Sequence, residues 1–282
     1  MNLRISTVMV VAAALLISFL ITRQPSISGS ADANKKAMSA GSNPATKMDD
    51  GKSTPVLVEL FTSEGCSSCP PADALLMRLG RTQPVQGADV IVLEEHVDYW
   101  DRLGWKDPFS SEAATARHGD YAAGFGNSQV YTPQMIVDGH TEFVGDSQND
   151  ALRSIRGAIQ TPKPAVKLSW GKSDQLAIRI QPQDNAASRN EVDVYLIVAE
   201  NMLHSDVKRG ENAGRALEHD GVTRQFISLG KIKNMSSGFS STYSTQIAST
   251  WNRGNLRAVV FAQDRQNHHV LAAGAIPFPS VS

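Results

Sequence analysis

Cys66 and Cys69 are the only two cysteines among the 282 residues of the chain, and two serines separate them. With no other cysteine available, they form a short-range dithiol, a disulfide with each other, or half of a metal site. A thiolate is the nucleophile of thiol–disulfide exchange and also a ligand for soft metal ions. The elements around the pair must therefore decide between a redox centre, a metal site and a structural cross-link.

The segments on either side of the pair predict a strand, a turn and a helix. Residues 55–61 are a short apolar run rich in strand formers, and they lead almost directly into the cysteines. After the pair, Leu75, Leu76 and Leu79 lie on one helical face, and Gly80 ends the pattern. A thiolate at the start of such a helix faces unpaired N–H groups, which lower its pKa from about 8.5 into the range of about 3.5 to 7.5.

This setting assigns different roles to the two sulfurs. Cys66 adjoins the flexible Gly65, so we expect it to be the exposed, attacking thiol, and Cys69, in the first helical turn, to be the resolving thiol. Pro70 and Pro71 oppose this arrangement, because the residue before a proline avoids helical backbone angles. A helix that begins only at Pro71 would weaken the effect of its dipole on Cys66.

Glu59 is the candidate proton acceptor near the pair. It lies between Val58 and Leu60 in the predicted strand, where burial would raise its pKa and let it exchange a proton with the Cys69 thiol. The alternative is a carboxylate at the strand edge that faces water or pairs with a cation.

Three further side chains could act beside the sulfurs. Trp100 and Trp105 lie in a predicted loop and could form an apolar rim, although large aromatic residues more often anchor a loop onto the core. His96 ends the next predicted strand and could stabilise a thiolate, but a buried histidine with its hydrogen bonds satisfied is the more common case.

The following segments complete an α/β pattern. Residues 89–97 are apolar enough for a buried parallel strand, and a right-handed crossover would bring residues 98–100 to the same rim as the cysteines. A polar helix is expected around 111–123, and residues 130–145 predict two strands joined by an Asp-Gly turn. A last helix, at about 147–159, begins with capping residues.

The N-terminal segment predicts export. An apolar run follows Arg4, and no acidic residue precedes Asp32, so residues 1–23 are interpreted as a cleaved signal peptide or as a retained anchor in the inner membrane. Residues 24–54 read as a flexible linker without apolar periodicity. We therefore expect a periplasmic or secreted protein, in a compartment where a partner sets the oxidation state of a dithiol.

Composition argues against nucleic acid as a partner, and the second half of the chain predicts a domain of a different kind, built from strands. Charged residues make up 20% and the formal net charge is -1, so nucleic-acid binding is not expected. Between residues 165 and 276, six short apolar or alternating runs without helices favour a β-sandwich. A long polar insertion, residues 201–223, could cover the dithiol or engage a partner, although packing between domains would explain its charges as well.

The order of these elements resembles the thioredoxin fold over about residues 55 to 160. Segments 61–73, 96–105 and 131–134 resemble more closely the secreted thioredoxin-like family known as domain of unknown function number 1223. That family name implies no activity, so the chemistry comes from the thioredoxin relationship alone. It implies that Thr132 and Pro133 form a cis-peptide loop that packs against the sulfurs and docks a substrate chain. The expected fold class is thus an α/β thioredoxin-like domain at 55–161 followed by an all-β sandwich-like domain at 162–282.

Three functions compete for this pattern. The first is an exported thiol–disulfide oxidoreductase that acts on protein thiols or disulfides together with a redox partner. The second is a copper(I)-handling protein that uses both thiolates, and the third is a binding module with a structural disulfide. We expect no cofactor and no dedicated metal ligands, because two cysteines exclude a four-thiolate zinc site within one chain. The strand–helix setting and Thr132-Pro133 favour the oxidoreductase.

Overall fold

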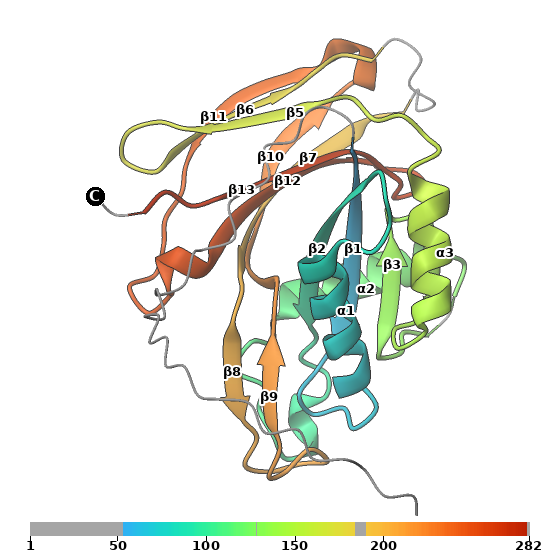
Figure 1. Ribbon diagram of the computed structural model, residues 1–282, viewed down its shortest axis with the longest axis vertical. Coiled ribbons are helices and arrows are strands. Elements are labelled where there is room, and N and C mark those ends of the chain that lie inside the picture. The colour runs from blue at the N-terminus through green and yellow to red at the C-terminus, as the bar shows by residue number, and fades with distance from the viewer. Residues whose placement is uncertain (1–52, 128, 184–189, 281–282) are drawn as a thin grey trace, which may run out of the picture. The chain divides into compact units, whose positions relative to one another are not determined.

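The computed structural model describes residues 53–127, 129–183 and 190–280 (Figure 1). The helices of these residues are α1 (Pro70–Thr82), α2 (Glu112–Gly124) and α3 (Gln148–Ala158), with short 3-10 turns η1 (Asp101–Leu103), η2 (Met235–Ser237) and η3 (Arg253–Asn255). The strands of the first half are β1 (Thr54–Thr62), β2 (Ala88–His96), β3 (Gln134–Val137) and β4 (Thr141–Val144). The strands of the second half are β5 (Val166–Trp170), β6 (Gln175–Ile180), β7 (Val192–Glu200), β8 (Leu203–Asp206), β9 (Ala216–His219), β10 (Val222–Ile232), β11 (Phe239–Ser244), β12 (Leu256–Asp264) and β13 (Val270–Pro277).

One mixed sheet contains strands from both halves of the chain. Its order is β13-β12-β7-β10-β2-β1-β3-β4. Strands β1 and β2 are parallel, and β10 joins β2 in parallel where Val222 pairs with Glu94. The other neighbours in this sheet are antiparallel, and β10 thereby connects the first half to β7, β12 and β13.

The predicted fold class is therefore wrong. Among the described residues, strands predominate over the three α-helices, and strands from both halves form one large mixed sheet, which is not an α/β thioredoxin-like fold. The error has a physical cause, because apolar periodicity identifies a strand but does not specify its hydrogen-bond partner. Strands β5, β6 and β11 do form a separate layer, in the order β11-β6-β5, that packs against β7 and β12, which is why the pattern resembled a sandwich.

Most of the local predictions are confirmed. The expected strands at 55–61 and 89–97 are β1 and β2, and the helices expected around 111–123 and 147–159 are α2 and α3. The Asp-Gly turn between β3 and β4 is also present, with Asp138 and Gly139 both at positive φ. A β-carbon at Gly139 would stand 1.9 Å from the carbonyl oxygen of His268, so this turn requires glycine.

Strand β1 is packed on both of its faces. Val56, Val58 and Leu60 of β1 pack against α1 and α3, because alternate residues of a strand point to one side. Phe61, on the other side, packs against Tyr121 of α2. Figure 1 shows α1 in front of β1 and β2 and α2 behind them. The two faces of β1 and β2 therefore offer two separate places for buried polar groups.

The predicted signal peptide or anchor lies outside the described residues, as does the predicted linker up to residue 52. Among the described residues, no helix is long and apolar enough to cross a membrane. Export stays a prediction.

Candidate functional site

Cys66 and Cys69 are joined in a disulfide at the start of α1. Their Cα atoms lie 5.5 Å apart, and the two residues are 1% and 0% exposed. The prediction that Cys66 is exposed is therefore wrong. Cys69 is the N-cap of α1, and its carbonyl oxygen accepts hydrogen bonds from the N–H groups of Ala72 and Asp73. The helix begins at Pro70, and Cys69 has helical backbone angles despite the proline that follows. The disulfide thus lies directly at the N-terminus of α1. In this state neither sulfur is available to copper(I).

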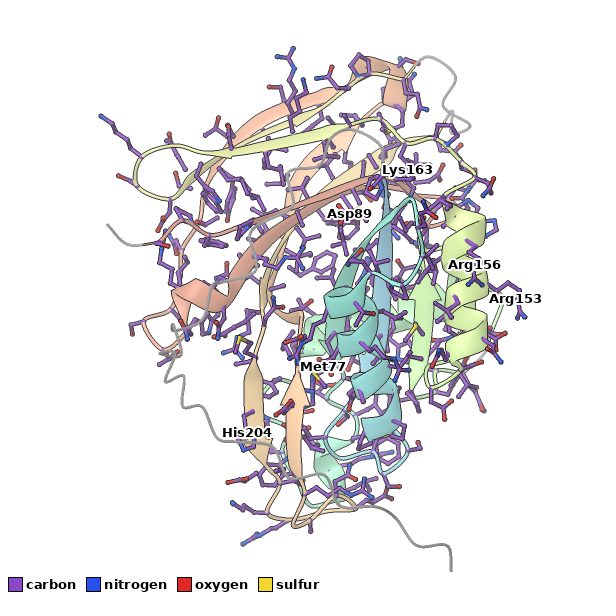
Figure 2. The ribbon with its side chains drawn as sticks, viewed as in Figure 1. Met77, Asp89, Arg153, Arg156, Lys163 and His204 are labelled. Carbon is purple, nitrogen blue, oxygen red and sulfur yellow. A yellow bond between two sulfur atoms is a disulfide. The ribbon has the colours of Figure 1, made fainter. Side chains whose placement is uncertain are left out.

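A loop from the second half of the chain contacts the turn that contains the disulfide. Strands β8 and β9 form a hairpin from the predicted polar insertion, and Figure 2 shows His204 on its first strand. At the tip of the hairpin, Asn212 Nδ2 donates to the carbonyl oxygens of Glu64, at 2.8 Å, and Cys66, at 2.9 Å. The N–H of Ser67 donates to Glu211 at 3.0 Å. Of the expected roles of the insertion, the structure contains contact with the Cys-x-x-Cys turn and also packing against the first half of the chain, where Asp220 pairs with Arg81 of α1.

Trp100, Thr132 and Pro133 lie at the same edge as the disulfide. Gln134, directly after Pro133, pairs with Phe61 of β1, and β1 leads into the cysteine turn. The Thr132-Pro133 peptide is cis. The indole N–H of Trp100 donates to Thr132 Oγ1 at 2.9 Å, and Gly65 packs against the Trp100 side chain. The three residues proposed to bind substrate are therefore neighbours in space, while their role stays a prediction.

Glu59 lies on the opposite face of the sheet from α1. Its carboxylate accepts hydrogen bonds from Arg117 at 2.6 and 2.9 Å and from the Tyr121 hydroxyl at 2.5 Å. The pairing raises the pKa of Arg117 above its ordinary value, against the effect of burial. Glu59 therefore has the cation that the alternative interpretation required, and the structure does not bring it to Cys69.

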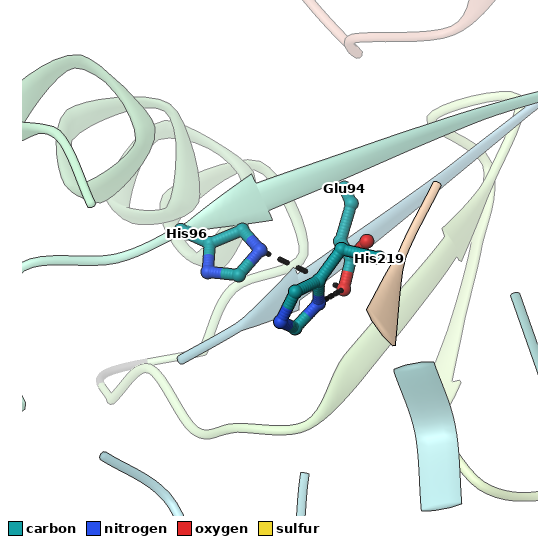
Figure 3. A group of neighbouring side chains, drawn as sticks. All are labelled: Glu94, His96 and His219. Atoms are coloured by element: carbon teal, nitrogen blue, oxygen red, sulfur yellow. Dashed lines mark hydrogen bonds and ion pairs between the residues drawn. The ribbon is translucent and has the colours of Figure 1, made fainter. Parts of the chain in front are cut away.

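On the face that contains α1, a second group of buried side chains was largely missed by the sequence analysis. Glu94 and His96 extend from the end of β2, and His219 ends β9 (Figure 3). His219 Nδ1 lies 2.8 Å from Glu94 Oε1, and His96 Nε2 lies 3.6 Å from the same oxygen. Only His96 was a candidate before. Its alternation with Glu94 in an apolar strand was the available signal, whereas nothing in the sequence places His219 beside them.

Side chains that contact this group also contact the cysteine turn. Asp107 accepts a hydrogen bond from the N–H of Glu64 at 2.8 Å and lies 2.7 Å from His96 Nδ1. Glu64 in turn accepts hydrogen bonds from the Trp105 indole at 2.7 Å and the Ser205 hydroxyl at 3.1 Å. Trp105 thus anchors its loop onto buried polar groups, and the disulfide turn shares its neighbours with the histidine cluster.

Burial and charge oppose each other in this cluster. Burial alone would raise the pKa of Glu94, but His219 and His96 lower it to about 2. Burial would lower the pKa of His219, but Glu94 and Glu64 raise it to about 10. Next to them, burial and the charge of Glu94 raise the pKa of Asp73 to about 8, so this carboxyl is protonated at neutral pH. The cluster is a set of interdependent charges in a dry environment.

Comparison with known proteins identifies the family. Residues 57–263 match the family described as "Protein of unknown function (DUF1223)". The chain belongs to this family. The DUF1223 membership confirms that part of the sequence-based resemblance, and it carries no activity with it. No curated protein matches the chain.

Two solved structures share the fold of this DUF1223 protein. A crystal structure of an Agrobacterium tumefaciens protein is 24% identical, with a TM-score of 0.63, and the match covers 82% of this chain and 97% of that one. HBP35 of Porphyromonas gingivalis is 13% identical, with a TM-score of 0.58, over 80% of this chain and 76% of that one. At these identities the likeness concerns the fold, and its extent agrees with one architecture that spans both halves of the chain.

Proposed function

We propose that this protein is an exported thiol–disulfide oxidoreductase that acts on protein substrates. The observation that carries the proposal is the Cys66–Cys69 disulfide at the N-terminus of α1. In that position, the thiolate released on reduction lies at the positive end of the helix dipole, which favours the charged form of a thiol. Periplasmic or secreted proteins are the proposed substrates, and a separate redox partner restores the starting state.

The reaction balances in two exchange steps. In the reduced protein, the Cys66 thiolate attacks one sulfur of a substrate disulfide, a mixed disulfide forms, and the other substrate sulfur leaves and takes up a proton. The Cys69 thiolate then attacks the Cys66 sulfur, which re-forms the Cys66–Cys69 disulfide and releases the second substrate thiol. The reverse sequence oxidises a substrate dithiol. Trp100, Thr132 and Pro133 are the proposed contacts for the substrate chain.

The short span of the disulfide argues against a purely structural role. In the chain-entropy account, stabilisation grows with the length of the closed loop, and a loop of about four residues contributes less than the ~3 kcal/mol of a 15-residue loop. The turn is also held by Asn212 and by the first hydrogen bonds of α1. Because the two cysteines are 1% and 0% exposed, substrate access requires movement of the hairpin tip.

The decisive experiment is a glutathione titration of the full-length protein, combined with a trapping assay. We expect a reduction potential within the range of about −270 to −120 mV that spans the known oxidoreductases. The Cys69→Ser variant should accumulate a mixed disulfide with scrambled ribonuclease, whose disulfides the Cys66 thiolate can attack, and Cys66→Ser should not. A potential below about −300 mV together with no trapped adduct would show a structural disulfide instead.

A further inference from the structure

The histidine cluster beside the disulfide combines residue types that bind transition metals. Glu94, His96 and His219 each offer a ligand atom, and these atoms all lie within 4.8 Å of one another. The three side chains are fully buried. They come from β2 and from the end of the hairpin strand β9, segments that lie more than 100 residues apart in the sequence. Figure 3 shows both imidazole rings directed toward the Glu94 carboxylate.

Several buried atoms of this cluster make no hydrogen bond within the described part of the chain. They are Glu64 Oε1, Glu94 Oε2, His96 Nε2 and His219 Nε2. A buried polar atom without a partner costs about 1–3 kcal/mol, and more when the group is charged. The nearest polar contacts of these atoms are long, at 3.4 Å from His219 Nε2 to Glu64 Oε1 and 3.6 Å from His96 Nε2 to Glu94 Oε1, while His219 Nδ1 bonds to Glu94 Oε1 at 2.8 Å. A bound cation would complete this arrangement.

The orientation of His96 supports a metal-binding role. Its Nδ1 lies 2.7 Å from Asp107 Oδ2, and Asp107 is itself held by the N–H groups of Glu64 and Phe109. A metal-binding histidine usually donates its other ring N–H to a carboxylate or carbonyl oxygen, which fixes the tautomer and directs the free nitrogen at the metal. Asp107 and His96 have this relationship, and the free Nε2 points into the cluster.

The spacing of the atoms suits a small tetrahedral ion. With metal–ligand distances of about 2.0–2.1 Å, two ligands of a tetrahedral zinc ion lie about 3.4 Å apart. His96 Nε2 lies 3.6 Å from Glu94 Oε1, and His219 Nε2 lies 3.4 Å from Glu64 Oε1. The imidazoles exclude a site designed for calcium or magnesium, which take oxygen ligands. Two histidines with carboxylates favour zinc or a similar divalent transition ion.

We propose that Glu94, His96 and His219 bind one zinc ion, with Glu64 as the nearest additional carboxylate. This site goes beyond the proposed exchange reaction and does not use the cysteines. It joins β2 in the sheet to β9 in the hairpin whose tip contacts the disulfide turn. A bound ion therefore holds the hairpin in place and slows reduction of the disulfide by small thiols.

The test begins with the purified full-length protein, stripped with a chelator and then titrated with zinc against a chromophoric competitor. We expect one zinc ion per chain, and an affinity at least 10-fold lower in His219→Gln and in His96→Gln. His204→Gln is the matched control, because His204 lies on the same hairpin but its side chain is 57% exposed. A Cys66→Ser, Cys69→Ser double variant should bind zinc as the unmodified protein does.

Two outcomes would overturn the proposal. One is an unmodified protein that binds no stoichiometric zinc, and the other is equal affinity in His219→Gln and the unmodified protein. If the buried variants do not fold, as judged by circular dichroism, thermal unfolding of His204→Gln is the test instead. Excess zinc must then raise its Tm, because a ligand of the native state stabilises that state, and an unchanged Tm contradicts the site. None of these readouts depends on oxidoreductase activity, so the two proposals fail independently.

Discussion

The two faces of strands β1 and β2 each bury a carboxylate beside basic side chains, but only one of the two groups is complete. On the α2 face, Glu59 accepts hydrogen bonds from Arg117 and Tyr121, and Gln263 donates to the Tyr121 hydroxyl at 2.9 Å. On the α1 face, each of Glu64, Glu94, His96 and His219 has a buried atom that makes no hydrogen bond to the described residues. Both groups are deeply buried, so solvent does not explain the difference.

This difference separates a structural network from a functional candidate. A buried ion pair whose hydrogen bonds are all made needs nothing further, and it specifies how α2 packs on the sheet. A buried network with unpaired atoms is costly unless another group completes it. The sequence made Glu59 a candidate, because it interrupts an apolar strand. The structure places the incomplete buried group on the opposite face of the sheet.

The largest expected effect comes from breaking the complete network. Arg117→Leu leaves the Glu59 carboxylate buried without its cation, and we expect the free energy of unfolding to fall by about 3–5 kcal/mol. Urea unfolding measures this loss. The double variant Glu59→Leu, Arg117→Leu is the control and should recover most of it, since apolar residues of similar size can replace a buried ion pair. A loss below about 1 kcal/mol in the single variant would contradict a structural role for the pair.

The α2 face also contains one incomplete group, which provides a test by pH. His118 stacks on Phe61, its Nε2 lies 2.7 Å from Gln134 Oε1, and its Nδ1 makes no hydrogen bond among the described residues. Burial lowers the pKa of His118 to about 4. Between pH 6.5 and 4 the unfolded chain binds a proton that the folded chain does not, so stability is complete above pH 6.5 and falls as the pH decreases toward 4.

We expect His118 to contribute up to about 1.4 kcal/mol per pH unit to this loss. The measurement is urea unfolding at pH 7, 6, 5 and 4.5 for the unmodified protein and for His118→Gln. The variant keeps a donor for Gln134 and removes the titration, so its stability should fall less steeply with acid. Identical slopes in the two proteins would show that His118 binds its proton equally in the folded and unfolded states.

A smaller effect is expected where the incomplete cluster meets the disulfide. Asn212→Ala removes the two hydrogen bonds that hold the hairpin tip on the carbonyl groups of Glu64 and Cys66. We expect dithiothreitol to reduce the disulfide about 10-fold faster, because moving the hairpin tip away becomes easier by about 1.4 kcal/mol. The rate is followed by quenching with an alkylating reagent and mass spectrometry.

Glu211→Gln provides the matched comparison for that experiment. It retains an acceptor for the Ser67 N–H at an exposed position, and we expect the reduction rate to change less than about threefold. Equal rates for the unmodified protein and Asn212→Ala would show that the hairpin tip does not limit access. The incomplete cluster on the α1 face would then have no demonstrated effect on the disulfide.

The elements of the first half could be predicted because their signals are local. Strand β1, helix α1 and the turn at Asp138 and Gly139 follow from apolar periodicity and turn chemistry over a few residues, although α1 continues past the predicted end at Gly80 to Thr82. The fold class was wrong because β10 reaches β2 from across the chain through a single paired register, Val222 with Glu94. Gly221, at positive φ and with a β-carbon position 2.7 Å from the Val92 carbonyl oxygen, permits that approach.

The parts of the candidate site that depend on distant segments could not be predicted either. Cys66 and Cys69 could be identified as a pair because they are three residues apart and have no other partners. Trp100 and Thr132 could be placed at one rim through the order of the strands. His219 and Asn212 could not be found in this way, since they reach the site on a hairpin encoded more than 140 residues after the cysteines.

By itself the sequence determined the identity of the cysteine pair, its place between a strand and a helix, and most of the secondary structure of the first half. These features depend on interactions between residues close along the chain. Only the tertiary structure decided which carboxylates lie beside the sulfurs, what contacts their turn, and how two halves of the chain share one sheet. Those outcomes depend on which distant segments pack together, because that packing determines the neighbours of each buried residue.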